Sequence, residues 1–130
     1  MFIIFVYFGR NKNEQKKGKE KREREKEEME LYKTVTASMD GKEKLLENDE
    51  CPKISMLTED YAEDIYILIL HHYYINHQSE TAKQNLLDGK VYPYGVKPLT
   101  KEGKGAKAIV AHLPEDLQKI IYRYLKIITV

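Results

Sequence analysis

The four histidines are the residues of this chain best suited to bind a metal ion. Two ligands on one helix must lie three or four residues apart to share a face. His71 and His72 are adjacent, His77 lies five residues beyond His72, and His112 is distant. Neither a thiolate nor a suitably spaced carboxylate completes a site. We therefore expect no metal and no cofactor, and we interpret the histidines as buried or boundary side chains bonded to backbone.

Two further patterns resemble catalytic or phosphate-binding motifs. The run Gly103-Lys104-Gly105 lacks the spacing of a phosphate-binding loop and is followed by strand-forming residues, so it predicts a hairpin turn. Ser55 and Ser79 have no base nearby in sequence, and no Gly-x-Ser-x-Gly motif is present. The sequence therefore predicts no catalytic residues, and we expect a protein that is not an enzyme.

Cys51 is the single cysteine of the chain. It cannot form an intramolecular disulfide, whereas small secreted domains usually carry several. It precedes Pro52 in a polar stretch without a basic neighbour, so we expect an inert loop thiol. We expect an intracellular protein, either cytoplasmic or nuclear.

Lysines and tyrosines gather between residues 90 and 107 and form the candidate interaction surface. Tyrosine is enriched at protein interfaces because it offers contact area and a hydroxyl at low entropic cost. Lysines can also neutralise phosphates while exposed aromatic rings stack on bases. We expect a protein partner, and nucleic acid is the alternative. The residues that we assign to this surface are Tyr92, Tyr94, Lys97, Lys101, Lys104 and Lys107.

The charge composition does not identify the partner. The 130 residues contain 22 Lys and Arg against 21 Asp and Glu, a formal net charge of +1. A dedicated nucleic-acid-binding domain usually has a strong basic excess, which this chain lacks. The composition gives no indication of the oligomeric state.

Two helices are expected to form the core of the domain. Thr58 is a good N-cap and acidic residues follow it, which predicts a helix over residues 59–77. Residues 65–70 are apolar on all sides, so this helix should be buried. Pro114 at the first helical position and an apolar stripe predict an amphipathic helix over residues 114–128. We expect this stripe to pack against Ile65, Leu68, Ile69 and Tyr73.

Between these helices the sequence predicts one β-hairpin. Residues 91–99 contain valine and tyrosine, but Pro93 and Pro98 cannot donate to a ladder, so an edge strand or extended loop is expected. Residues 106–113 predict the second strand. The fold class is therefore α+β, a small α-β-β-α domain over residues 58–130.

Residues 1–57 are expected to be a charged tail and linker, disordered or partly helical. Residues 11–30 are low complexity and rich in Lys, Arg and Glu, without an apolar stripe that could be buried. Residues 1–8 are apolar but too short for a membrane span and are not arranged as a signal peptide. We expect them to be a disordered apolar end, and we expect the chain to have no membrane span.

Overall fold

A computed structural model describes residues 3–7, 29–77, 93–99 and 105–129. Its elements in chain order are β1 (Ile3–Val6), a helical stretch at 29–37, α2 (Glu50–Ser55), α3 (Glu59–Asn76), η1 (Pro93–Gly95), β2 (Lys97–Pro98), β3 (Ala106–Ile109), η2 (Val110–His112) and α5 (Glu115–Ile128). The α+β class expected from the sequence is confirmed. The expected α-β-β-α order is only a part of this arrangement, because a strand and two helices precede α3.

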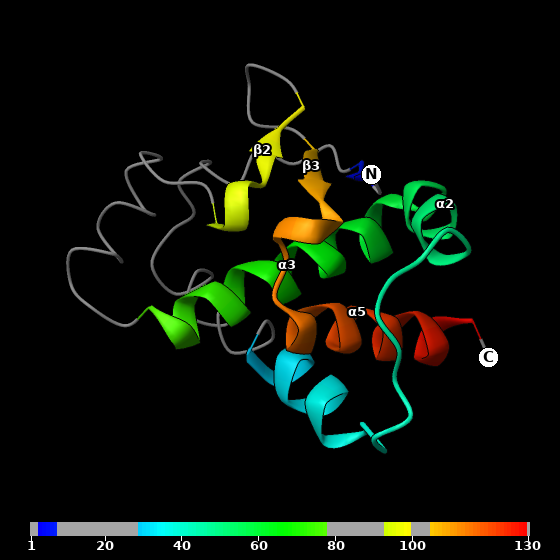
Figure 1. The fold of residues 1–130 in the computed structure, drawn as a ribbon, viewed down its shortest axis with the longest axis vertical. Helices are drawn as coiled ribbons and strands as arrows, with labels where there is room; N and C mark the ends of the chain where they lie inside the picture. Colours follow the sequence, from blue (N-terminus) through cyan, green and yellow to red (C-terminus); the bar gives the residue numbers. More distant parts are fainter. Residues whose placement is uncertain (1–2, 8–28, 78–92, 100–104, 130) are drawn as a thin grey trace.

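The sheet has three antiparallel strands in the order β1-β3-β2. Ile4 pairs with Ala108 and Val6 with Ala106, and all four side chains are buried. Because successive side chains of a strand point to opposite faces, these residues define the inner face of the sheet. In Figure 1, α3 lies between this sheet and α5.

Strand β1 corrects the expectation of a disordered apolar end at residues 1–8. Ile3–Val6 pairs along its whole length with β3. The outer edge of β1 is also held, because the backbone N–H of Phe5 donates to Ser55 Oγ in α2 at 3.3 Å. A strand this short gains its stability from distant partners, so the local sequence does not reveal it. Residues 8–28, where most of the expected low-complexity tail lies, fall outside the described residues.

The segment expected to be a linker contributes to the core. Val35, Leu46 and Ile54 are each buried, although the segment that contains them is mostly polar. They belong to the same cluster as the apolar residues of α3 and α5. The core therefore takes residues from both sides of the boundary that the sequence predicts between residues 57 and 58.

Helix α3 confirms the predicted helix at 59–77 to within one residue. Acidic Glu59 and Asp60 occupy its first turn, as expected. The Thr58 hydroxyl makes no capping hydrogen bond, so this part of the expectation is wrong. The Thr58 carbonyl instead accepts from the N–H of Ala62 at 2.9 Å.

Helix α5 confirms the predicted C-terminal helix, with Pro114 immediately before its first residue. Its stripe of Leu117, Ile120, Ile121, Tyr124 and Leu125 is buried. The same core cluster contains Ile65, Leu68 and Ile69 of α3, as expected. Tyr73 is the exception, because its ring packs against Tyr94 and His77.

The hairpin is confirmed as an antiparallel pairing of β2 with β3, but both strands are shorter than expected. Backbone at 93–95 and 110–112 forms 3-10 turns in place of extended strand. Strand β2 is an edge strand, as Pro98 predicts. Of the expected turn at Gly103-Lys104-Gly105, only Gly105 is described.

Candidate functional site

The structure separates the predicted interaction residues. Lys97 and Lys107 are exposed and lie directly opposite each other on β2 and β3. Tyr94 is half-buried in η1, and its hydroxyl lies 2.6 Å from His72 Nδ1. The remaining three predicted residues, Tyr92, Lys101 and Lys104, lie outside the described residues.

Lys97 and Lys107 share one row of the sheet with Phe5. Lys107 on the central strand pairs with Phe5 on one side and with Lys97 on the other. The alternation that buries Ile4 and Val6 places this row on the opposite face. We call Phe5, Tyr7, Lys97 and Lys107 the outer face of the sheet.

Phe5, which pairs with Lys107, and Tyr7 contribute two aromatic rings to this face. The rings of Phe5 and Tyr7 are nearly parallel, with centroids 6.4 Å apart and an interplanar angle of 18°. Tyr7 has 54% of its surface exposed. Sequence reasoning missed both residues. The signal in the sequence is the alternation along Ile4-Phe5-Val6-Tyr7, which is typical of a half-buried strand.

The lysine pair has an electrostatic cost for the free protein. Like charges directly opposite on neighbouring strands destabilise a sheet by a few tenths of a kcal/mol, up to about 1. Within the described part of the chain, neither lysine forms an ion pair with an acidic side chain. An anionic group bound between them would relieve this repulsion.

His72 is the centre of a second polar cluster. Its imidazole is only 3% exposed and lies between η1 and the start of α5. Nδ1 faces the Tyr94 hydroxyl, and Nε2 lies 2.8 Å from Asp116 Oδ2. We call Tyr94, His72 and Asp116 the His72 junction. The histidines were expected to bond to backbone, but His72 bonds to two side chains, whereas His77 Nδ1 lies 3.0 Å from the Tyr73 carbonyl as expected.

The ionisation of the junction follows from its surroundings. Burial and the nearby Asp116 carboxylate raise the pKa of Tyr94 to about 12, so the phenol is protonated at neutral pH. Burial alone would raise the pKa of Asp116, but the hydrogen bond and the charge of His72 outweigh it and lower that pKa below its usual value. Asp116 is therefore ionised at neutral pH and can only accept a hydrogen bond.

The order Tyr, His, Asp matches that of a nucleophile, a base and an orienting carboxylate. Tyr94 also has a left-handed backbone, with φ 53° and ψ 30°, which costs a non-glycine residue about 1–3 kcal/mol. Both imidazole nitrogens are bonded, one to Tyr94 and the other to Asp116, and the phenol is protonated. The arrangement connects three elements of the chain, α3, η1 and α5.

Other candidate residues have structural surroundings. Cys51 is buried in α2 and not in a loop, and burial, followed by the charge of Glu50, raises the pKa of its thiol. The thiol is therefore poorly reactive, as expected, for a different reason. In the described residues, no group of three or more His, Cys, Asp or Glu side chains is placed to hold a metal ion.

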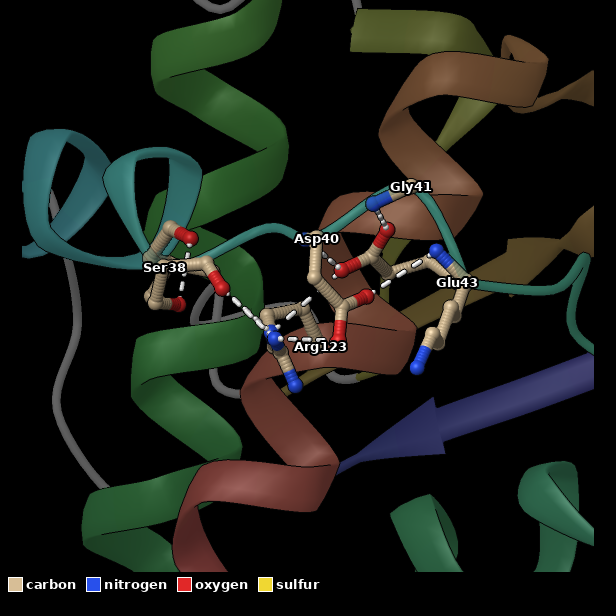
Figure 2. A network of polar contacts seen from close by, with 7 residues as sticks. Ser38, Asp40, Gly41, Glu43 and Arg123 are labelled. Atoms are coloured by element: carbon tan, nitrogen blue, oxygen red, sulfur yellow. Dashed lines mark hydrogen bonds and ion pairs between the residues drawn. The ribbon is translucent and has the colours of Figure 1, made fainter.

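A third polar network fixes the segment after residue 37 onto α5 (Figure 2). Arg123 donates to the Ser38 carbonyl at 2.9 and 2.6 Å and forms ion pairs with Asp40 and Glu43, both at 3.3 Å. The Glu43 carboxylate also accepts the N–H groups of Asp40 and Gly41. These bonds explain how a polar stretch is held in place, and they occupy the charged groups that take part.

Comparison with protein-family models, with curated proteins and with solved structures gave no match. None of the helices in the described ranges combines the length and the apolar composition needed to cross a membrane. The assignment of function therefore rests on the geometry of the chain itself.

Proposed function

We propose that this protein is a non-enzymatic interaction module that binds an acidic segment of another protein through the outer face of its sheet. The observation that carries the proposal is the row formed by Phe5, Lys107 and Lys97 across three strands. Two exposed lysines and two aromatic rings on one face suit a segment that combines carboxylates with apolar side chains. Tyr92, Lys101 and Lys104, which we assign to the same surface from the sequence, lie outside the described residues.

The charge balance favours a protein over a polyanion. Nucleic-acid binding draws on many phosphate contacts and on a basic field over the domain. This chain has a formal net charge of +1. Lys97 and Lys107, which lie opposite each other, can neutralise two carboxylates of a peptide, and this does not require the rest of the domain to be basic. We place the interaction inside the cell, in the cytoplasm or the nucleus.

The non-enzymatic part of the proposal rests on the sequence, in which we find no catalytic motif.

Single-stranded nucleic acid is the second candidate, through the same surface at 90–107 joined by β1. The near-parallel rings of Phe5 and Tyr7 favour it, because aromatic rings can stack on bases while lysines on the same face contact phosphates. The two candidates differ in their dependence on salt. Phosphate contacts make the binding constant for a single strand fall steeply with salt, by about 0.7 of a power of the salt concentration for each contact.

Fluorescence anisotropy with the full chain and three labelled probes tests the proposal. The probes are a peptide of alternating Glu and Phe, a peptide of alternating Gln and Phe, and oligodeoxythymidine. We expect the acidic peptide to bind more tightly than the neutral peptide and the oligonucleotide at physiological salt. The double variant Lys97→Gln/Lys107→Gln should weaken this binding about tenfold, since each exposed ion pair contributes up to about 1 kcal/mol.

The matched control is the double variant Lys33→Gln/Lys44→Gln, at two exposed lysines outside the sheet. It removes the same number of positive charges without touching the sheet and should leave binding unchanged. An equal loss in the control and in Lys97→Gln/Lys107→Gln would show a nonspecific effect of net charge and would reject the outer face as the site. Preferred binding of oligodeoxythymidine with steep salt dependence would establish the second candidate, and no binding of any probe would overturn both.

A further inference from the structure

Lys97 and Lys107 bring two like charges close together on the outer face. They are opposite residues of the antiparallel pair of β2 and β3, and both are exposed. The Phe5 N–H points away from β3, since it donates to Ser55 Oγ. Phe5 and Lys107 therefore form a non-hydrogen-bonded pair of the ladder, and the Lys107 N–H points toward β2. Lys97 and Lys107 are then a hydrogen-bonded pair, whose Cα atoms lie about 5.5 Å apart.

The ammonium groups of these two lysines can reach one point above the sheet. Each lysine carries its charge on a flexible four-carbon stem, so the position of the ammonium group is adjustable. Directly opposite side chains point to the same face, with Cβ atoms about 4.5–5.5 Å apart. In the part of the chain that the structure describes, neither lysine forms an ion pair with an acidic side chain. One anion placed between the two ammonium groups would contact both.

We infer, building on the proposed function, that this anion is the phosphoryl group of a phosphorylated side chain in the partner segment. A phosphorylated residue carries a charge of about −1.5 to −2 at pH 7 and three strong acceptor oxygens. It can therefore pair with both ammonium groups at once and remove their repulsion. A carboxylate has a single charge, so two acidic residues of the partner must be ordered to give the same neutralisation.

Phe5 defines what lies beside the phosphorylated residue. Its Cα is about 4.5 Å from that of Lys107, and therefore about 7 Å along the row from the midpoint between Lys107 and Lys97. In an extended segment, side chains two residues apart share one face and are about 6.6–6.8 Å apart. A segment that crosses the strands can thus place its phosphoryl group between the lysines and an apolar side chain, two positions away, over Phe5.

The edges of the sheet favour binding across its face over the addition of a strand. Strand addition uses the main-chain donors and acceptors of an exposed edge. At β1 the outward N–H of Phe5 is bonded to Ser55 Oγ of α2. At the opposite edge β2 has two residues, and Pro98 lacks an N–H. The segment is therefore held by its side chains, and the two lysines select its charged group.

Fluorescence anisotropy with the full chain and three labelled peptides tests the inference. The peptides have the sequence Gly-Phe-Gly-X-Gly, with phosphoserine, Glu or Ser at X. At about pH 7.5 we expect the phosphoserine peptide to bind about fivefold more tightly than the Glu peptide, since one more exposed ion pair forms. The Ser peptide should bind most weakly. The preference for phosphoserine should decline toward about pH 5.5, because the second phosphate pKa is about 6 whereas Glu stays ionised.

Single variants show whether both lysines share one group. In Lys97→Gln and in Lys107→Gln the ratio of the phosphoserine and Glu affinities should fall to about one, because the remaining lysine forms one ion pair with either peptide. Lys33→Gln and Lys44→Gln, at exposed lysines outside the sheet, should keep the ratio. A phosphoserine peptide with Gly in place of Phe should bind about two- to tenfold more weakly, since the contact with Phe5 is lost.

The alternating Glu and Phe peptide, measured alongside, separates failure of this inference from failure of the proposed function. Equal binding of the phosphoserine and Glu peptides, or a preference that persists in either single variant, would overturn the phosphoryl site alone. Competition by inorganic phosphate as strong as by unlabelled phosphoserine peptide would also overturn it, by showing a site for the free ion. Binding of the alternating peptide without the phosphoserine peptide would overturn only the inference, and binding of neither would overturn both.

Discussion

The outer face of the sheet and the His72 junction use polar groups in opposite ways. At the junction, every polar atom of a buried imidazole has a partner within the chain. On the outer face, two exposed lysines lie opposite each other at a cost to the sheet, on the same face as the rings of Phe5 and Tyr7. Buried polar groups must be satisfied internally, whereas exposed ones can remain available. The junction therefore stabilises the fold, and we propose that the outer face is the surface available to a partner.

The largest expected loss of stability comes from substituting the buried side of strand β1, and the exposed side should be far less sensitive. Ile4→Ala removes a fully buried side chain and should lower the free energy of unfolding by about 2–5 kcal/mol. Tyr7→Ala, on the exposed side, should cost less than about 1 kcal/mol. Urea denaturation followed by circular dichroism measures both. Similar small losses for the two variants would mean that β1 does not belong to the core.

The second-largest expected loss of stability comes from substituting Gly105, the residue immediately before β3, the strand that carries Lys107. Gly105 has φ +69°, and a Cβ there would lie 2.9 Å from Leu99 Cδ1 and 3.0 Å from the Val6 carbonyl oxygen. Gly105→Ala should therefore destabilise the protein by about 1–3 kcal/mol. Gly41→Ala is the matched control, because its φ is +82° but a Cβ would contact nothing within 4 Å. Equal thermal unfolding midpoints for the two variants would contradict the close approach of β1 to Gly105.

Tyr94→Phe tests the internal satisfaction of the junction. The variant leaves the buried Nδ1 of His72 without its hydroxyl partner, which should cost about 1–2 kcal/mol of unfolding free energy at pH 7. Lys97→Ala, on the outer face, should change stability by less than about 0.5 kcal/mol or raise it slightly by removing like-charge repulsion. If Lys97→Ala were the more damaging variant, the contrast between the two regions would fail.

The smallest expected effect is the dependence on pH through Asp116. The pKa of Asp116 in the folded protein lies below its value of about 4 in the unfolded chain. The ionised carboxylate therefore stabilises the folded protein above about pH 4, and this stabilisation is lost as the pH falls through the folded-state pKa. Most of the Asp116 side chain is exposed, so the contribution is below about 1 kcal/mol. Asp116→Asn should flatten the loss of stability between about pH 5 and pH 2. An identical pH profile for the variant would contradict the assignment.

The two long helices were predictable because their signals are local. Acidic first turns and apolar patterns within one segment define α3 and α5. Strand β1 was not predictable, since four residues become a strand only by pairing with β3 near the other end of the chain. Val35, Leu46 and Ile54 were similarly hidden, because they are scattered through a polar segment and their burial depends on distant elements.

The candidate site shows the same division between local and distant information. Composition indicated that Lys97 and Lys107 would lie on a hairpin, which β2 and β3 confirm as a pairing. Phe5 and Tyr7 join them only through β1. The bond between His72 and Asp116 joins residues 44 positions apart, and no local pattern predicts it.

The most direct test of the outer face is to map the binding of the Glu–Phe peptide on the full chain by ¹⁵N–¹H chemical shifts. We predict that the largest changes fall on the amides of Phe5, Tyr7, Lys97 and Lys107, and that Arg123 and its partners in the third network are unaffected. Changes centred on Arg123 or on the His72 junction, with the outer face unchanged, would contradict the proposal.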